Sequence, residues 1–235
     1  MMYIKGCAEF LFCFDKRYAF FCTHSSVSQL LKYYRIAHAD LCINTTWDCW
    51  LNDGDNDNKL YLDIDPLLTA YQRYCKIYTC SESEEYPLIW EKNVDAIRQD
   101  RPVILGTDYY FLPFHHKYQK EHGAHAITLY GFDDKKSVAY IFDYNTPYFA
   151  YKGTISYKVL KAARLSENAW NGAINSGGHI QSISIEMQLN NHRESVVKGG
   201  IQDILATVRR IINEYFHGDE SGGRKRGREA VTALC

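Results

Sequence analysis

Cys22 lies at the start of a segment, FFCTHSSVSQLLKYYRI (residues 20–36), whose spacing predicts an amphipathic helix over 23–36. Apolar side chains recur in it at the three- and four-residue intervals of one helical face: Val27, Leu30, Leu31 and Tyr34. Hydroxyl side chains that could cap the helix stand near its start: Thr23, Ser25 and Ser26. The unpaired N–H groups and positive dipole end of a helix favour a thiolate, which makes Cys22 a candidate nucleophile. The alternative is a small buried hydrophobe.

A histidine and a carboxylate that could serve such a nucleophile stand far downstream. His125 immediately precedes an apolar segment, 126–132, which predicts a strand, and the polar turn DDKK leads into a second strand, 137–144. An antiparallel hairpin would bring Asp143, or Asn145 two residues later, beside His125. That acceptor could fix one imidazole nitrogen and leave the other to take the thiol proton. A one-residue slip in register would turn Asp143 to the opposite face.

The order of the predicted elements places helices first and strands later. Further strands are expected over 102–111 and 180–189, and further helices over 66–74, 89–101, 155–165 and 200–216. Residues 1–21 are expected to form short strands or loop, and 43–64 a loop or hairpin. These elements predict an α+β fold in which the Cys-bearing helix packs on a mainly antiparallel sheet. A cysteine on a helix and a distant histidine on a strand are typical of papain-like enzymes.

Length and composition limit the classes of protein that the chain can represent. The 235 residues predict one domain over 1–217, and the Gly-rich, charged segment 218–235 predicts a disordered tail. A formal net charge of −1 gives no indication of a nucleic-acid or membrane partner, and no apolar run approaches the roughly 20 residues of a membrane span. No signal-peptide pattern is present, so we expect a cytoplasmic protein with reduced thiols. The apolar stripe of helix 200–216 predicts core packing or a seam that would form a homodimer.

Several other chemistries are disfavoured by missing motifs. The eight cysteines include no C-x-x-C, and the histidines form no H-E-x-x-H, so no metal site is expected. The chain also lacks the glycine-rich phosphate-binding patterns and the G-x-S-x-G of serine hydrolases.

The segment RPVILGTDYYFLPFHHKYQKEHGAHAITLYGFDDKKSVAYIFDY (101–144) resembles the butirosin biosynthesis protein H N-terminal domain family, which are papain-like cysteine acyltransferases. The matching residues are Asp108, Tyr110, Pro113, Tyr118, His122, His125, Gly131, Asp133, Asp134 and Asp143. CTHSSVSQLLKYYRI (22–36) and YKGTISYKVLKAARLS (151–166) are also similar to family segments, so the resemblance covers about residues 15–166, before a C-terminal strand and helix over 180–216.

This resemblance implies an enzyme of natural-product or antibiotic biosynthesis. It would move an acyl or aminoacyl group from a carrier-protein thioester to a small-molecule amine. Its catalytic residues would be Cys22 as nucleophile, His125 rather than His122 as base, and Asp143 as orienting acid. The residues expected at the substrate are Asp108, Tyr109, Tyr110, His122 and Asn145. No cofactor of its own is expected, because the acyl donor arrives on the phosphopantetheine arm of the carrier.

The chain also departs from what that mechanism needs. Phe21 precedes Cys22, and no glutamine stands about six residues before it to complete an oxyanion hole. The backbone N–H of Cys22 and a second donor from Lys16, His24 or Tyr109 would have to serve. A cysteine peptidase or thioesterase, or an inactive papain-like binding module, are the alternative functions.

Overall fold

The computed structural model describes residues 1–10, 22–35, 47–52, 60–64, 75–80, 86–143, 150–169, 182–187 and 224–226, and seven positions between 202 and 213. The chain divides into two compact units. The first comprises Met1–Ile36 and Tyr71–Asn191, and the second comprises Ala37–Ala70 and His192–Cys235. Each unit is described separately below. The predicted domain boundary at 217 stays a prediction.

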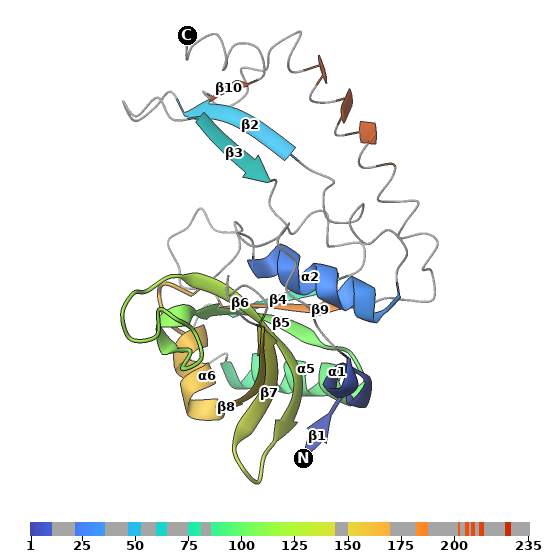
Figure 1. The fold of residues 1–235 in the computed structure, drawn as a ribbon, viewed down its shortest axis with the longest axis vertical. Helices are drawn as coiled ribbons and strands as arrows, with labels where there is room; N and C mark the ends of the chain where they lie inside the picture. Colours follow the sequence, from blue (N-terminus) through green and yellow to red (C-terminus); the bar gives the residue numbers. More distant parts are fainter. Residues whose placement is uncertain are drawn as a thin grey trace. The chain divides into compact units, whose positions relative to one another are not determined.

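The first unit contains a seven-stranded antiparallel sheet (Figure 1). Six strands follow the order β4–β9–β5–β6–β7–β8, and β1 also pairs with β6. The bounds are β1 Met2–Tyr3, β4 Cys75–Cys80, β5 Val103–Asp108, β6 Ala124–Asp133, β7 Val138–Asp143, β8 Tyr151–Ser156 and β9 Ser182–Met187. The predicted α+β class with an antiparallel sheet is therefore confirmed.

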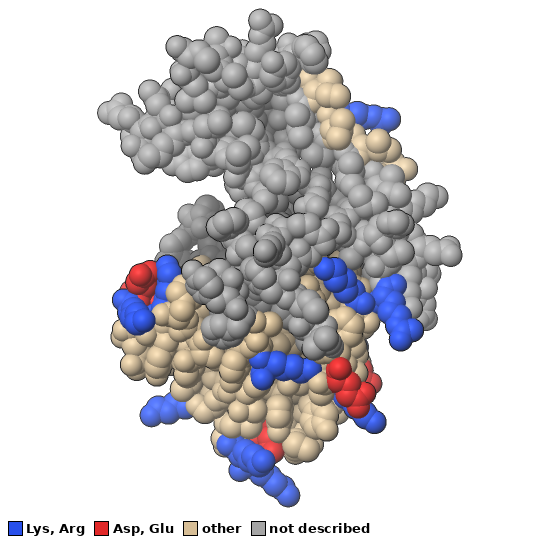
Figure 2. All heavy atoms as spheres, in the orientation of Figure 1, with Lys and Arg blue, Asp and Glu red and all other residues tan. Residues whose placement is uncertain are grey.

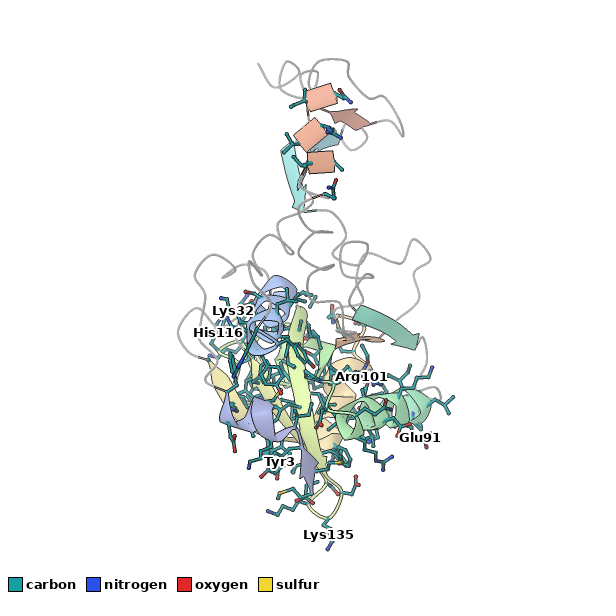
Figure 3. The ribbon with its side chains drawn as sticks, turned by 90° about the vertical axis from the view of Figure 1, so that its right-hand side faces the viewer. Tyr3, Lys32, Glu91, Arg101, His116 and Lys135 are labelled. Atoms are coloured by element: carbon teal, nitrogen blue, oxygen red, sulfur yellow. The ribbon has the colours of Figure 1, made fainter. Side chains whose placement is uncertain are left out.

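Strands β5 and β6 form the centre of the core. Every residue of β5 is buried, and in β6 only the first residue, Ala124, is exposed. Helices account for this burial, because α2 (Cys22–Tyr33) lies on one side of the sheet and α5 (Tyr86–Arg98) on the other (Figures 1 and 3). A strand covered on both faces needs apolar residues at consecutive positions, which explains the nearly continuous apolar sequence of β5.

Helix α2 is buried on more than its apolar stripe. Val27, Leu30 and Leu31 are fully buried, as the periodicity predicts. The small polar side chains of Ser25, Ser26 and Ser28 are also buried. Small residues let a helix approach its neighbours closely, so α2 is enclosed rather than laid on the surface. The helix therefore holds the position of Cys22, its first residue.

Three segments of the first unit differ from the sequence-based expectations. Residues 1–10 contain the short helix α1 (Lys5–Glu9), where strand or loop was expected. Its last carbonyls are satisfied by the Lys152 ammonium, which donates to the oxygens of Cys7, Ala8 and Phe10. The predicted helix 155–165 begins later, because β8 continues to Ser156. The Ser156 hydroxyl accepts the Val159 N–H and caps α6 (Tyr157–Arg164). Strand β4 was not anticipated.

The second unit contains a three-stranded antiparallel sheet of order β10–β2–β3. Strands β2 (Trp47–Asn52) and β3 (Leu60–Ile64) form the hairpin expected within 43–64. Strand β10 (Arg224–Arg226) lies inside the segment predicted to be a tail. The described positions between 202 and 213 are helical, and Leu205, Val208 and Ile212 are each nearly half exposed. The predicted helix 66–74 lies outside the described residues.

Candidate active site

Cys22 is placed at the first residue of α2 with its side chain partly exposed. Cys7 is the other cysteine described as a free thiol, and it is completely buried. Burial raises the pKa of the Cys7 thiol to about 12, so that side chain stays a thiol. Burial also opposes ionisation of Cys22, but hydrogen bonds from His125, the Ala126 backbone and Thr23 outweigh it and lower its pKa. Of these two thiols, only Cys22 is suited to nucleophilic chemistry.

His125 is the second residue of β6, and it is 2% exposed. Its Nε2 is 2.8 Å from Oδ2 of Asp143, whose side chain is fully buried. The imidazole and the Cys22 thiol also act on each other: His125 lowers the pKa of the thiol, and Cys22 raises the pKa of the imidazole. Because Nε2 is used by Asp143, Nδ1 is the nitrogen left for the cysteine. The structure therefore brings the three predicted catalytic residues together.

The charges of Asp143, His125 and Cys22 shift the pKa values of the imidazole and of the thiol in opposite directions. Burial lowers the pKa of His125, but the Asp143 carboxylate and the Cys22 thiolate together raise it to about 10. The pKa of Cys22 moves in the opposite direction, downward. A proton therefore favours the imidazole over the thiol, which favours a thiolate–imidazolium pair over the neutral pair.

The strand register explains why Asp143 reaches His125. Thr128 pairs with Phe142 and Leu129 with Ile141, so β7 continues with Asp143 beside Ile127. Residue 127 lies two positions from His125, and alternate residues of a strand share a face. Asp143 and His125 therefore project on the same side of the sheet. Asn145, the predicted alternative, lies outside the described residues.

Asp108, predicted at the substrate, is instead surrounded by donors from its own chain. Its Oδ1 accepts the backbone N–H groups of Tyr110 (2.9 Å) and Gly123 (3.0 Å). Its Oδ2 contacts His122 Nδ1 (2.7 Å) and the Ser166 hydroxyl (2.6 Å). A carboxylate has about four lone-pair sites, so these contacts use its whole acceptor capacity. They favour a structural role, in which Asp108 fastens the loop 109–123 to the end of β5.

The other predicted substrate residues belong to the same loop. Tyr109 and Tyr110 begin the short helix η2 (Tyr109–Phe111), which follows β5 directly. Tyr110 stacks on the His122 ring with centroids 3.9 Å apart, and the Tyr109 hydroxyl donates to the carbonyl of His122 at 2.9 Å. A side chain at Gly123 would collide with the Tyr109 ring, so glycine is needed there. Contact of Tyr109, Tyr110 and His122 with a substrate stays a prediction.

His115 is a site residue that the sequence reasoning did not anticipate. Its ring is 6% exposed, with its centroid 4.9 Å from that of His125. The same ring stacks on Tyr109, with centroids 4.9 Å apart and an interplanar angle of 10°. His115 comes from the irregular segment PFHHKY, where no periodicity indicates which histidine faces inward. His115 reaches His125 because the loop that Asp108 anchors folds this segment back over β6. No pattern in the sequence indicates that fold.

The structure gives no evidence for a metal centre or a membrane span within the residues it describes. No group of three or more ligating His, Cys, Asp or Glu side chains occurs among them. None of their helices is long and apolar enough to cross a membrane. Lys16 and the side chain of His24, two predicted oxyanion donors, lie outside the described positions.

An α+β fold that holds a buried histidine–aspartate pair and a partly exposed thiol whose pKa that histidine lowers defines a candidate cysteine-nucleophile site. Residues 72–144 match the family model described as butirosin biosynthesis protein H, N-terminal, which confirms the resemblance predicted from the sequence. The match includes His125 and Asp143 and ends before α6; Cys22 lies upstream of it. No curated protein matches the chain.

Proposed function

We propose that the protein is a papain-like cysteine acyltransferase of natural-product biosynthesis, with Cys22 as the acyl-carrying residue. The observation that carries the proposal is the chain of contacts from Cys22 through His125 to Asp143. The matched family is named for butirosin biosynthesis, which supports an antibiotic-like product. The roles of the three residues are our assignment from geometry and charge.

In the first step, the Cys22 thiolate attacks the carbonyl carbon of a thioester on the phosphopantetheine arm of a carrier protein. A new S–C bond forms at Cys22 and the bond to the pantetheine sulfur breaks. The leaving thiolate takes the proton that His125 holds, which leaves an acyl-enzyme and a neutral imidazole. The N-terminus of α2 places a positive dipole end beside the oxyanion that develops.

In the second step, the amine acceptor attacks the acyl-enzyme. The N–C bond forms, the S–C bond to Cys22 breaks, and His125 takes the proton that the amine loses. The thiolate–imidazolium pair is thereby restored. Exchange between thioesters is nearly isoenergetic and amide formation from a thioester is downhill, so the protein must mainly orient the amine and keep water away.

The surface of the first unit is compatible with an anionic donor arm. Figure 2 shows Lys and Arg side chains spread over the visible face of this unit, with fewer Asp and Glu. Lys117 and Lys120 belong to the loop 109–123 beside the site, and Lys120 is exposed. The phosphodiester of a phosphopantetheine arm would be attracted to such side chains. Carrier protein and amine acceptor are the partners that this proposal assigns.

The test is an acyl-transfer assay followed by intact-mass measurement. The protein is mixed with an acyl-loaded carrier protein, and the acyl adduct is expected on wild type and on Cys7→Ala but not on Cys22→Ala. Adding an amine should discharge the adduct as an amide. An adduct that persists in Cys22→Ala overturns the assignment. Discharge as free acid at the same rate with and without amine would show a thioesterase instead, and no adduct in any variant would favour an inactive module.

A further inference from the structure

His115 contacts two rings of the candidate site. One neighbour is Tyr109, whose ring is parallel to the imidazole, and the other is His125, whose ring is inclined to it at 58°. Tyr109 also meets His125 edge-on, with centroids 6.4 Å apart. The three rings are thus in mutual contact, and His115 and Tyr109 form an aromatic wall beside the base.

The His115 ring is neutral at neutral pH. Its Nδ1 accepts the backbone N–H of Lys117 at 3.3 Å, which assigns the ring proton to Nε2. Burial and the charge of His125 lower its pKa to about 4, and the charges of His116 and Lys117 act in the same direction. Asp143 acts in the opposite direction, which places His115 near both partners of the His125–Asp143 pair. The wall therefore adds no positive charge beside the imidazolium.

We propose that His115 is a positioning residue, whose ring, together with Tyr109, covers the His125–Asp143 hydrogen bond and keeps water from competing for it. The inference rests on the proposed function, because it concerns the base of that reaction. A hydrogen bond between charged groups is stronger in a dry, low-dielectric site than in contact with water. Removing the ring should let water solvate the Asp143 carboxylate and loosen the orientation of His125.

The expected consequence is a change in the ionisation of Cys22. A weaker His125–Asp143 pair holds its proton less tightly, so the Cys22 thiolate forms at higher pH. A rise of half to one unit in the Cys22 pKa would lower the thiolate fraction on the acid side about three- to tenfold. The ring itself should matter more than its N–H group, because the proposed role is to exclude water.

The experiment measures the pH profile of Cys22 alkylation by iodoacetamide in the full chain. Three variants separate the ring from the donor: His115→Ala removes both, His115→Phe keeps a ring, and His115→Gln keeps a donor. Lys135→Ala, an exposed position in the turn between β6 and β7, is the control. We expect the acid limb of the alkylation profile to lie at higher pH in the Ala and Gln variants than in wild type. In the Phe variant it should lie close to that of wild type. Circular dichroism melts report whether each variant is folded.

Two results would overturn the inference. One is wild-type behaviour of every His115 variant, and the other is rescue by Gln but not by Phe, which would make His115 a hydrogen-bond donor to substrate. His125→Ala is measured in parallel. If it abolishes the low-pH reactivity of Cys22 while the His115 variants change nothing, only the wall is wrong. If His125→Ala also has no effect, the proposed function itself fails.

Discussion

Two histidine–aspartate pairs stand side by side at one end of the sheet. His122 contacts Asp108 at 2.7 Å and His125 contacts Asp143 at 2.8 Å, so distance does not distinguish them. Their surroundings do, because the His122 side chain is 45% exposed and that of His125 is 3% exposed. The aspartates differ as well: Asp108 also accepts bonds from two backbone N–H groups and a hydroxyl.

The difference shows how two similar pairs can serve different purposes. In the His122–Asp108 pair the carboxylate accepts from four donors, three of them in the loop 109–123 and the fourth the Ser166 hydroxyl, and His122 is one of the four. In the His125–Asp143 pair the histidine is the link between a carboxylate and a thiol. A proton transfer to a substrate needs the second arrangement, since the imidazole must have a reactive group on its other nitrogen. The first pair builds the loop that carries the wall residues Tyr109 and His115.

The largest expected effect is that of His125→Ala. Without the imidazole, only the weaker contributions of Ala126 and Thr23 oppose burial, so the pKa of the Cys22 thiol rises and the thiolate fraction near neutral pH falls. Loss of a positioned acid–base group costs about a hundredfold or more in rate. The measurement is the rate of acyl-enzyme formation, with Cys22 alkylation as a check on ionisation.

The matched comparison is His122→Ala, three residues away in the other pair. Its ring has no contact with Cys22 among the described residues, and its side chain is exposed. We therefore expect less than a threefold change in the rate of acyl-enzyme formation and in the rate of Cys22 alkylation. If His122→Ala slows acyl-enzyme formation more than His125→Ala does, the roles of the two pairs are reversed.

A smaller loss is expected for Asp143→Asn. The amide can still contact His125, but it removes the charge that raises the pKa of the imidazole. A serine triad loses about 10⁴ in rate from this change, and because the thiolate here is already favoured by its own contacts we expect about a ten- to hundredfold loss. The pH–rate profile should also narrow on its alkaline side, because His125 then loses its proton at lower pH. An unchanged alkaline limb would mean that Asp143 does not set the charge of His125.

The contact between His125 and Asp143 was predictable from the sequence, because local patterns determine it. The spacing of Leu30 and Leu31 indicated the helix behind Cys22, and the turn DDKK fixed a hairpin that sets His125 beside Asp143. Both signals lie within about 20 residues of the side chains that they position, where helix and strand periodicity are informative. The bulge in β6 near Gly131 lies beyond this pairing, so it does not disturb the register at Asp143.

The contacts of the second pair could not be predicted from the sequence, for the opposite reason. Asp108 was placed at the substrate because it matches the pattern of the family that the sequence resembles. Its partner Ser166 lies 58 residues away, and its other donors come from an irregular loop with no period. His115 was missed for the same reason, since only the folded loop shows which of two adjacent histidines is buried. Tertiary contacts between irregular segments leave no repeating pattern in the sequence.

Asp108→Asn tests the structural role of the second pair, and its effect on the chemistry should be the smallest. The amide group presents N–H donors to neighbours that are themselves donors, so we expect a loss of about 1–3 kcal/mol in the free energy of unfolding. Burial raises the pKa of Asp108, but its contacts with His122, Ser166 and the loop N–H groups lower it overall. A carboxylate with a depressed pKa stabilises the fold above its unfolded-state pKa, and this contribution is lost as pH falls through the folded-state pKa.

The difference in the free energy of unfolding between wild type and Asp108→Asn should therefore be largest at neutral pH and should shrink in acid. Urea unfolding at neutral and at acid pH measures it. Asp95→Asn, an exposed carboxylate paired with Arg98, is the control and should stay within about 0.5 kcal/mol of wild type. Once corrected for unfolded protein, the rate of acyl-enzyme formation in Asp108→Asn should fall less than in Asp143→Asn. A variant of wild-type stability with a raised KM for the acyl donor would contradict the structural role. It would return Asp108 to the substrate site, where the sequence had placed it.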